Sequence, residues 1–186
     1  MTTRSAKTSN MLDVKSSLLL IVDVQEKLMP VISEQKNVIS NIVKLVTFGE
    51  LVNIPIVYTE QYKLGATMPE IKERLSHSEQ ILKKEFNCFI NDNFRKRIDS
   101  SKISSLIVAG VETHICICQT ALEAIGQYNV HVVSDAVSSR TRANHKVGIE
   151  RMFQSSVVIT STEMVMFELL KKADTEEFKK TLELIK

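Results

Sequence analysis

The chain has 186 residues, of which 44% are hydrophobic and 25% are charged, and its formal net charge is +2. This length suits one domain that buries roughly 70% of its unfolded surface. No apolar run reaches the roughly 18 residues of a membrane span, and the near balance of charge argues against a dedicated nucleic-acid surface.

The cysteines and the N-terminus bear on location. The 3 cysteines are odd in number and irregularly spaced, which excludes a disulfide framework and favours a reducing compartment. Met1–Asn10 is rich in hydroxyl groups and lacks acids, so two interpretations stay open: a frayed terminus and an organelle transit peptide. It has no apolar core of the secretory type. We expect residues 1–15 to be flexible, residues 16–186 to form one domain, and the location to be cytoplasmic, with the mitochondrion as the alternative.

Strands and helices are expected to alternate along the chain. Short apolar runs bounded by turn residues predict strands at 18–24, 56–59, 80–83, 105–109, 130–133 and 157–159. Apolar residues at three- and four-residue spacing predict helices at 31–52, 70–75, 91–98, 111–126, 141–153, 162–170 and 175–185. Pro30, Pro55 and Pro69 mark turns or helix ends between these segments.

This alternation predicts an α/β fold: a doubly wound, six-stranded parallel sheet with helices on both faces, joined by right-handed crossovers. If the strand order is 3-2-1-4-5-6, the order reverses between the first and the fourth strand. Ligands bind outside the carboxyl ends of the strands at such a point. Asp23 ends the first strand and Cys116 follows the fourth, so both are expected to face one crevice.

Cys116 is a candidate nucleophile. We expect it in the first turns of a helix, where unpaired N–H groups and the helix dipole favour a thiolate over a thiol. Asp23 interrupts an apolar strand, and it is either a structural carboxylate that ties loops together or a general base. Lys83 or Lys84, at the end of the third strand, offers a basic partner, although paired lysines are more often solvated.

Other chemistry has little support in the sequence. His114 precedes Cys116 by two residues, a spacing at which side chains on a helix do not face each other, so a Cys–His pair and a metal site are both weak interpretations. The glycine-rich nucleotide, zinc-protease and serine-hydrolase motifs are absent. We expect no metal and no cofactor.

Four motifs spread along the chain are more specific together than singly. They are LLIVDVQ at 19–25, KKEFNCF at 83–89, GVETHIC at 110–116 and DAVSSR at 135–140. They resemble the isochorismatase-like cysteine hydrolases, and Thr59–Tyr62 follows the pattern of the small isochorismatase-domain subgroup. The resemblance implies a triad of Asp23, Lys83 and Cys116. Lys83 is chosen over Lys84 because the family's lysine stands three residues before an aromatic residue, here Phe86.

The resemblance also implies a cis peptide bond between Val111 and Glu112, which would turn the backbone N–H groups of Glu112 and Cys116 toward an oxyanion. The expected substrate-pocket residues are Gln25, Gln61, Phe86 and Ile115. The implied activity is hydrolysis of a small amide or related C–N substrate through a thioester. Isochorismatases tend to lack the cysteine, and the Asp-x-His metal motif of nicotinamidases is replaced by Glu60–Tyr62, so isochorismate, nicotinamide and a metal are not expected.

The same resemblance also indicates which partners to expect. The family forms dimers or tetramers, so we expect a homo-oligomer, with Phe178, Leu182 and Ile185 as an apolar helix face that docks on the domain or on a partner subunit. We expect a small-molecule substrate, no membrane association and no nucleic acid. The alternative is a non-catalytic member of the fold that acts by association, with RNA for instance, since some members have been labelled mitochondrial ribonucleases.

Overall fold

The computed structural model describes residues 10–186. The expectation of a targeting segment, and most of the flexible segment 1–15, therefore lie outside the described residues. The strands are β1 (Ser17–Val22), β2 (Ile56–Gln61), β3 (Glu79–Lys83), β4 (Ser105–Val111), β5 (Asn129–Ser138) and β6 (Val158–Thr160). The α-helices are α1 (Gln35–Leu51), α2 (Pro69–Lys72), α3 (Asp92–Asp99), α4 (Cys118–Ala124), α5 (Arg142–Gln154), α6 (Thr162–Leu170) and α7 (Glu176–Ile185).

The strands form one six-stranded sheet in the order β3-β2-β1-β4-β5-β6, and every neighbouring pair is parallel. This confirms the predicted fold class and strand order. β1 is central and buried along its whole length, as its uninterrupted apolar sequence predicts for a strand covered on both faces. The carboxyl ends of β1, β2, β3 and β4 consequently meet at one edge of the sheet.

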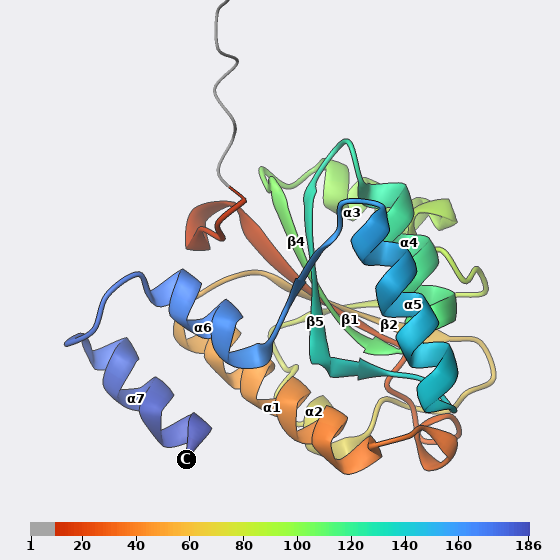
Figure 1. Ribbon diagram of the computed structural model, residues 1–186, viewed down its shortest axis with the longest axis horizontal. Coiled ribbons are helices and arrows are strands. Elements are labelled where there is room, and N and C mark those ends of the chain that lie inside the picture. The colour runs from red at the N-terminus through yellow and green to blue at the C-terminus, as the bar shows by residue number, and fades with distance from the viewer. Residues whose placement is uncertain (1–9) are drawn as a thin grey trace, which may run out of the picture.

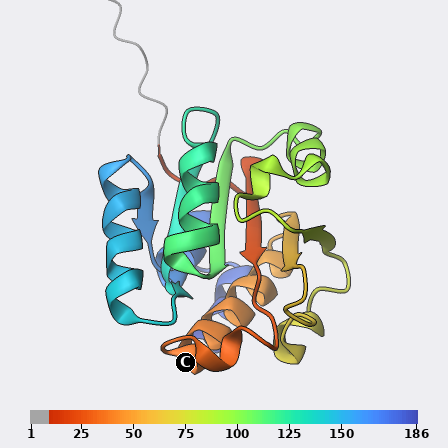
Figure 2. The same ribbon diagram turned by 90° about the vertical axis from the view of Figure 1, so that its right-hand side faces the viewer.

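Helices cover both faces of the sheet (Figure 1). One face packs against α1, α2 and α6, with α7 outside them. The other face packs against α3, α4 and α5, and the turned view separates these helices from α1 across the sheet (Figure 2). The largest fully buried side chains include Phe48 on one side and Phe94 on the other. Within residues 10–186, no helix combines the length and the apolar character needed to cross a membrane.

Gly110 allows the two central strands to approach closely where the crevice begins. It pairs with Val22 and has a φ of +120°, and a Cβ added there would lie 2.1 Å from the Val22 carbonyl oxygen. Only glycine combines this backbone conformation with this spacing. The sequence break at Gly110 thus marks a strand contact as well as the end of an apolar run.

Several boundaries differ from the prediction. Helix α1 starts at Gln35 rather than near residue 31 because Pro30 lies in a separate 3-10 turn, Met29–Val31. Strand β5 continues to Ser138, past its predicted end. The packed chain also starts ahead of residue 16, since Leu12 is only 2% exposed and its N–H donates to the Glu168 carboxylate.

The terminal helix α7 docks on its own domain, which was one of the two predicted possibilities. The Phe178 ring meets the Phe167 ring of α6 edge-on, with centroids 6.2 Å apart, and Leu184 and Ile185 pack against the core. The apolar face expected to serve a partner is therefore largely used within the chain.

Candidate active site

Asp23 lies just beyond β1, in the crevice predicted from the strand order. It has a φ of +53°, a left-handed conformation that aspartate tolerates better than most residues. Its side chain is 1% exposed. The Thr59 hydroxyl at the end of β2 donates to Oδ1 at 2.7 Å, and the Asp23 N–H donates to the Thr59 carbonyl at 3.2 Å. Thr59 thus holds both the carboxylate and the backbone of Asp23.

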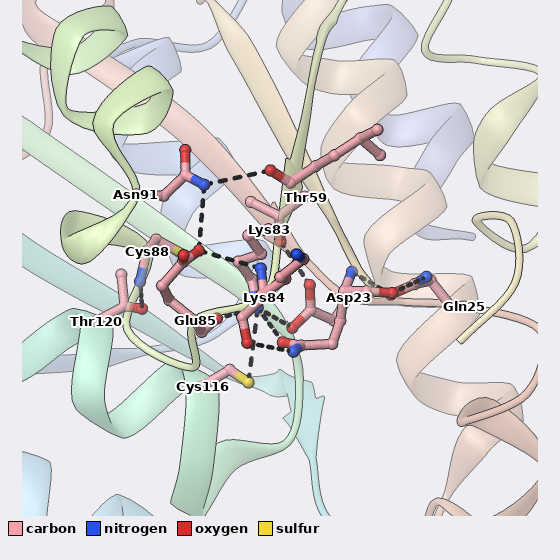
Figure 3. Close-up of polar contacts among 12 residues, drawn as sticks. Asp23, Gln25, Thr59, Lys83, Lys84, Glu85, Cys88, Asn91, Cys116 and Thr120 are labelled. Carbon is pink, nitrogen blue, oxygen red and sulfur yellow. Dashed lines mark hydrogen bonds and ion pairs between the residues drawn. The ribbon is translucent and has the colours of Figure 1, made fainter. Parts of the chain in front are cut away.

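Lys83 brings the third strand into the same site. Its side chain is fully buried, and its Nζ lies 2.6 Å from Asp23 Oδ2 and 3.8 Å from Cys116 Sγ. Figure 3 shows the three side chains converging from separate elements. Lys84 is exposed and makes no ion pair among the described residues. Three residues that are distant in sequence therefore meet at one buried site.

Cys116 lies in a π-helical turn, Thr113–Ile117, and α4 begins only at Cys118. Cys116 therefore lies in the first turn of a continuous helical segment, as predicted, but this turn is π-helical. The turn is backed by α5, because a Cβ added at Gly148 would lie 3.0 Å from the His114 Cα. Cys116 is 7% exposed. Its surroundings, more than a helix terminus, govern its ionisation.

The site opposes ionisation of the thiol in the resting protein. Burial raises the pKa of Cys116 above its ordinary range, the Asp23 carboxylate raises it further, and the Lys83 ammonium opposes both. Burial and the Asp23 carboxylate thus oppose the thiolate-favouring effect expected of a helix terminus. Burial also raises the pKa of Asp23, against the lowering effect of Lys83 and Thr59. Burial alone would lower the pKa of Lys83, but the charges of Asp23 and Cys116 hold it above its ordinary value.

Polar contacts fasten the segment that carries Cys116. The Val111–Glu112 peptide bond is cis, and the buried Glu112 carboxylate accepts hydrogen bonds from the Arg140 backbone N–H at 2.8 Å and from its Nε at 3.2 Å. The Thr113 hydroxyl lies 2.9 Å from His145 Nδ1 on α5. The His114 Nδ1 lies 2.9 Å from the Ser139 hydroxyl, so His114 faces away from a Cys–His pairing.

The expected pocket residues separate into two groups. Gln25 and Gln61 line a cavity of about 550 Å³ that also reaches Lys83. The Gln25 amide, however, is occupied: Nε2 donates to the carbonyls of Gln61 and Gly65, and Oε1 accepts from the Gln61 N–H. Phe86 is 55% exposed and Ile115 packs against the core; neither lines this cavity.

Two polar groups at the site were missed in the sequence. Thr59 bonds Asp23, and the Glu85 carbonyl accepts from Lys83 Nζ at 3.1 Å. Thr59 had a usable signal, because it stands near the carboxyl end of a predicted strand beside the first one. A backbone carbonyl such as that of Glu85 has no sequence signal.

A doubly wound parallel sheet that brings a buried cysteine, aspartate and lysine together at its carboxyl edge defines an open-sheet α/β protein with a candidate site at the point where the strand order reverses. The family follows from the sequence: residues 17–164 match the profile of the Isochorismatase domain, and the chain belongs to the isochorismatase family.

Relatives and solved structures agree over nearly the whole chain. The "Secreted isochorismatase effector Isc1" of Phytophthora sojae is 36% identical, over 92% of this chain and 85% of its own length. The MAR1 ribonuclease structure from Caenorhabditis elegans is 30% identical with a TM-score of 0.88, covering 94% of this chain and 92% of that one. The YcaC gene product of Escherichia coli, described as an octameric hydrolase of unknown specificity, is 24% identical with a TM-score of 0.88, covering 94% and 90%.

Proposed function

We propose that this protein is a cysteine hydrolase that cleaves a small amide or related C–N substrate through a thioester on Cys116. The proposal is carried by one observation: a fully buried Lys83 ammonium contacts both the Asp23 carboxylate, at 2.6 Å, and the Cys116 sulfur, at 3.8 Å. Burying a lysine and an aspartate costs several kcal/mol per ion. Apolar residues would serve packing better, so this arrangement favours a chemical role.

The first half of the reaction uses Asp23 as a general base. Because the Cys116 thiol stays protonated at rest, its proton must leave as the sulfur attacks the substrate carbon, and the Asp23 carboxylate receives it. The Lys83 ammonium stabilises the negative charge on sulfur during this transfer. The oxyanion of the tetrahedral intermediate would accept hydrogen bonds from the backbone N–H groups of Glu112 and Cys116.

The second half returns the site to its starting state. Collapse of the intermediate breaks the C–N bond, and Asp23 gives its proton to the leaving nitrogen, which departs as ammonia or an amine. Asp23 then takes a proton from the water that attacks the thioester. Breaking the C–S bond releases the carboxylic acid, and the proton held by Asp23 returns to the Cys116 thiolate.

A screen of small amides for ammonia release tests the proposal. Any activity found should fall at least a hundredfold in Cys116→Ala and in Lys83→Met, because each change removes a group that touches the reacting atoms. Cys118→Ala is the matched control, since Cys118 packs in the core and contacts neither Asp23 nor Lys83. Undiminished turnover by Cys116→Ala protein would refute the mechanism.

The alternative of an RNA-associated member stays a prediction. It draws on the name of the C. elegans relative, a ribonuclease. Binding driven by phosphate contacts must weaken steeply with salt, so RNA binding measured at 50 and 200 mM salt would separate it from hydrolysis. We expect self-association under either function, and the octameric E. coli relative supports this expectation.

A further inference from the structure

The Lys83 ammonium has three N–H donors and no acceptor, and the structure supplies three oxygen acceptors for them. They are Asp23 Oδ2 at 2.6 Å, Gln61 Oε1 at 2.7 Å and the Glu85 carbonyl at 3.1 Å. Cys116 Sγ, at 3.8 Å, is the most distant of its contacts. Four acceptors therefore share three N–H groups, and the sulfur, as the most distant of them, receives the longest hydrogen bond from Lys83.

Gln61 is itself held so that its amide oxygen faces Lys83. Its Nε2 donates to the Lys84 carbonyl at 2.8 Å, and its backbone N–H donates to Gln25 Oε1 at 2.7 Å. Exchanging the amide oxygen and nitrogen would point an NH₂ group at an ammonium and an oxygen at a carbonyl, so only one orientation satisfies both ends. Gln25, 1% exposed, anchors the Gln61 backbone in turn.

From this geometry we infer that Gln61 is a positioning residue, which holds the Lys83 ammonium beside Asp23 and limits the hydrogen bond that Lys83 gives to the Cys116 sulfur. The inference rests on the proposed function, because it concerns the same triad. It replaces the expectation that Gln61 contacts substrate with a role exerted through Lys83. Substitutions at Gln61 should change the ionisation of Cys116 without touching the sulfur.

Two substitutions of Gln61 should shift the pH profile of Cys116 reactivity in opposite directions. Gln61→Glu keeps the shape and adds a negative charge against Lys83, which weakens the help that the ammonium gives to a thiolate. Gln61→Met removes one oxygen acceptor and frees one Lys83 N–H, which can strengthen the long hydrogen bond to Cys116 Sγ. A residue that only supported packing would produce the same change, or none, in both variants.

The test follows the alkylation rate of Cys116 by iodoacetamide against pH, resolved by peptide mass spectrometry. It needs no substrate. Gln61→Glu should move the rate profile upward by about one pH unit, a tenfold slower reaction at fixed pH, while Gln61→Met should move it downward. Gln80→Glu, an exposed residue of β3, adds the same charge away from the site and should leave the profile unchanged.

The inference is overturned if Gln61→Glu causes no upward shift, or if folded Gln61→Met protein shows no downward shift. Circular dichroism and urea denaturation of each variant establish that the compared proteins are folded; Gln61→Glu, being isosteric, provides the comparison if Gln61→Met unfolds. The Asp23→Asn variant distinguishes a failure of the role inferred for Gln61 from a failure of the proposed triad. If the Cys116 profile does not respond to Asp23→Asn, the proposed function fails; if it responds to Asp23→Asn alone, only the role of Gln61 fails.

Discussion

Replacing Asp23 with Asn should have opposite effects on alkylation and on turnover. The carboxylate and the Cys116 sulfur both contact Lys83 Nζ, at 2.6 and 3.8 Å, so they lie no more than about 6 Å apart. At an effective dielectric constant of about 20, two unit charges at that separation interact by about 3 kcal/mol, or about two pKa units. Removing the Asp23 charge should lower the pKa of the thiol by about that amount.

Iodoacetamide alkylation between pH 6 and 9 measures this change. The pH profile of Cys116 should move downward by about two units in Asp23→Asn, a rate increase of up to about a hundredfold at fixed pH. Cys118 is an internal reference, since burial raises its pKa and the charge of Asp23 does not contribute to that shift. Turnover of any substrate should fall about 10²- to 10⁴-fold, because the general base is gone.

Stability must be measured on the same samples. The variant leaves a buried Lys83 without its counter-charge, which should cost about 3–5 kcal/mol, so urea denaturation has to establish that the protein is folded under assay conditions. Asp99→Asn, at an exposed position of α3, is the control. Alkylation of Cys116 that is unchanged or slower in folded Asp23→Asn protein would refute the electrostatic reasoning.

Three further predictions follow from the same structure. Because burial raises the pKa of Asp23 above its ordinary 3.8, kcat/KM should decline on acidification at a pH above that value; a decline only below it would contradict the base assignment. Burial lowers the pKa of His131 below 6.5 and neither ring nitrogen has a partner, so the unfolded chain binds the extra proton and stability should fall below pH 6.5, by up to about 1.4 kcal/mol per unit. Urea denaturation at pH 7.5 and 5.0 should show a smaller difference in His131→Leu, and an equal one would refute this. Gly110→Ala should cost at least ~3 kcal/mol, because its Cβ would meet the Val22 carbonyl, whereas thermal denaturation of Gly126→Ala, where nothing lies within 4 Å, should show about 1–2 kcal/mol.

Much of the site could be predicted because strand ends are visible in a sequence. A central parallel strand that is buried on both faces requires an uninterrupted apolar run, so Asp23 stands out as a charge after β1. Lys83 ends the edge strand β3, whose residues are mostly exposed, and the strand order brings both strand ends to one edge of the sheet. The same rule would have found Thr59. Motif spacing added the choice of Lys83 over Lys84, whose side chains lie on opposite sides of the chain end because successive strand residues alternate.

The ionisation of Cys116 could not be predicted in this way. The sequence suggested a helix terminus, whose dipole favours a thiolate. In the folded chain the cysteine lies in a π-helical turn ahead of α4, and burial with Asp23 beside it raises its pKa. Desolvation depends on what covers a side chain from all directions, and that information comes from segments far away in the sequence.

Gln61 illustrates, at one residue, the difference between what the sequence predicts and what the tertiary structure decides. The sequence by itself predicted that it lies near the carboxyl end of a strand, which made it a candidate pocket residue, and it is the last residue of β2. Only the tertiary structure decided what its amide contacts, because the pairing of β2 with β3 sets Gln61 opposite Lys83 and Gln25 pins its backbone. Local patterns of polarity specify strands, helices and their ends, whereas hydrogen-bond partners and burial are properties of the whole packed chain.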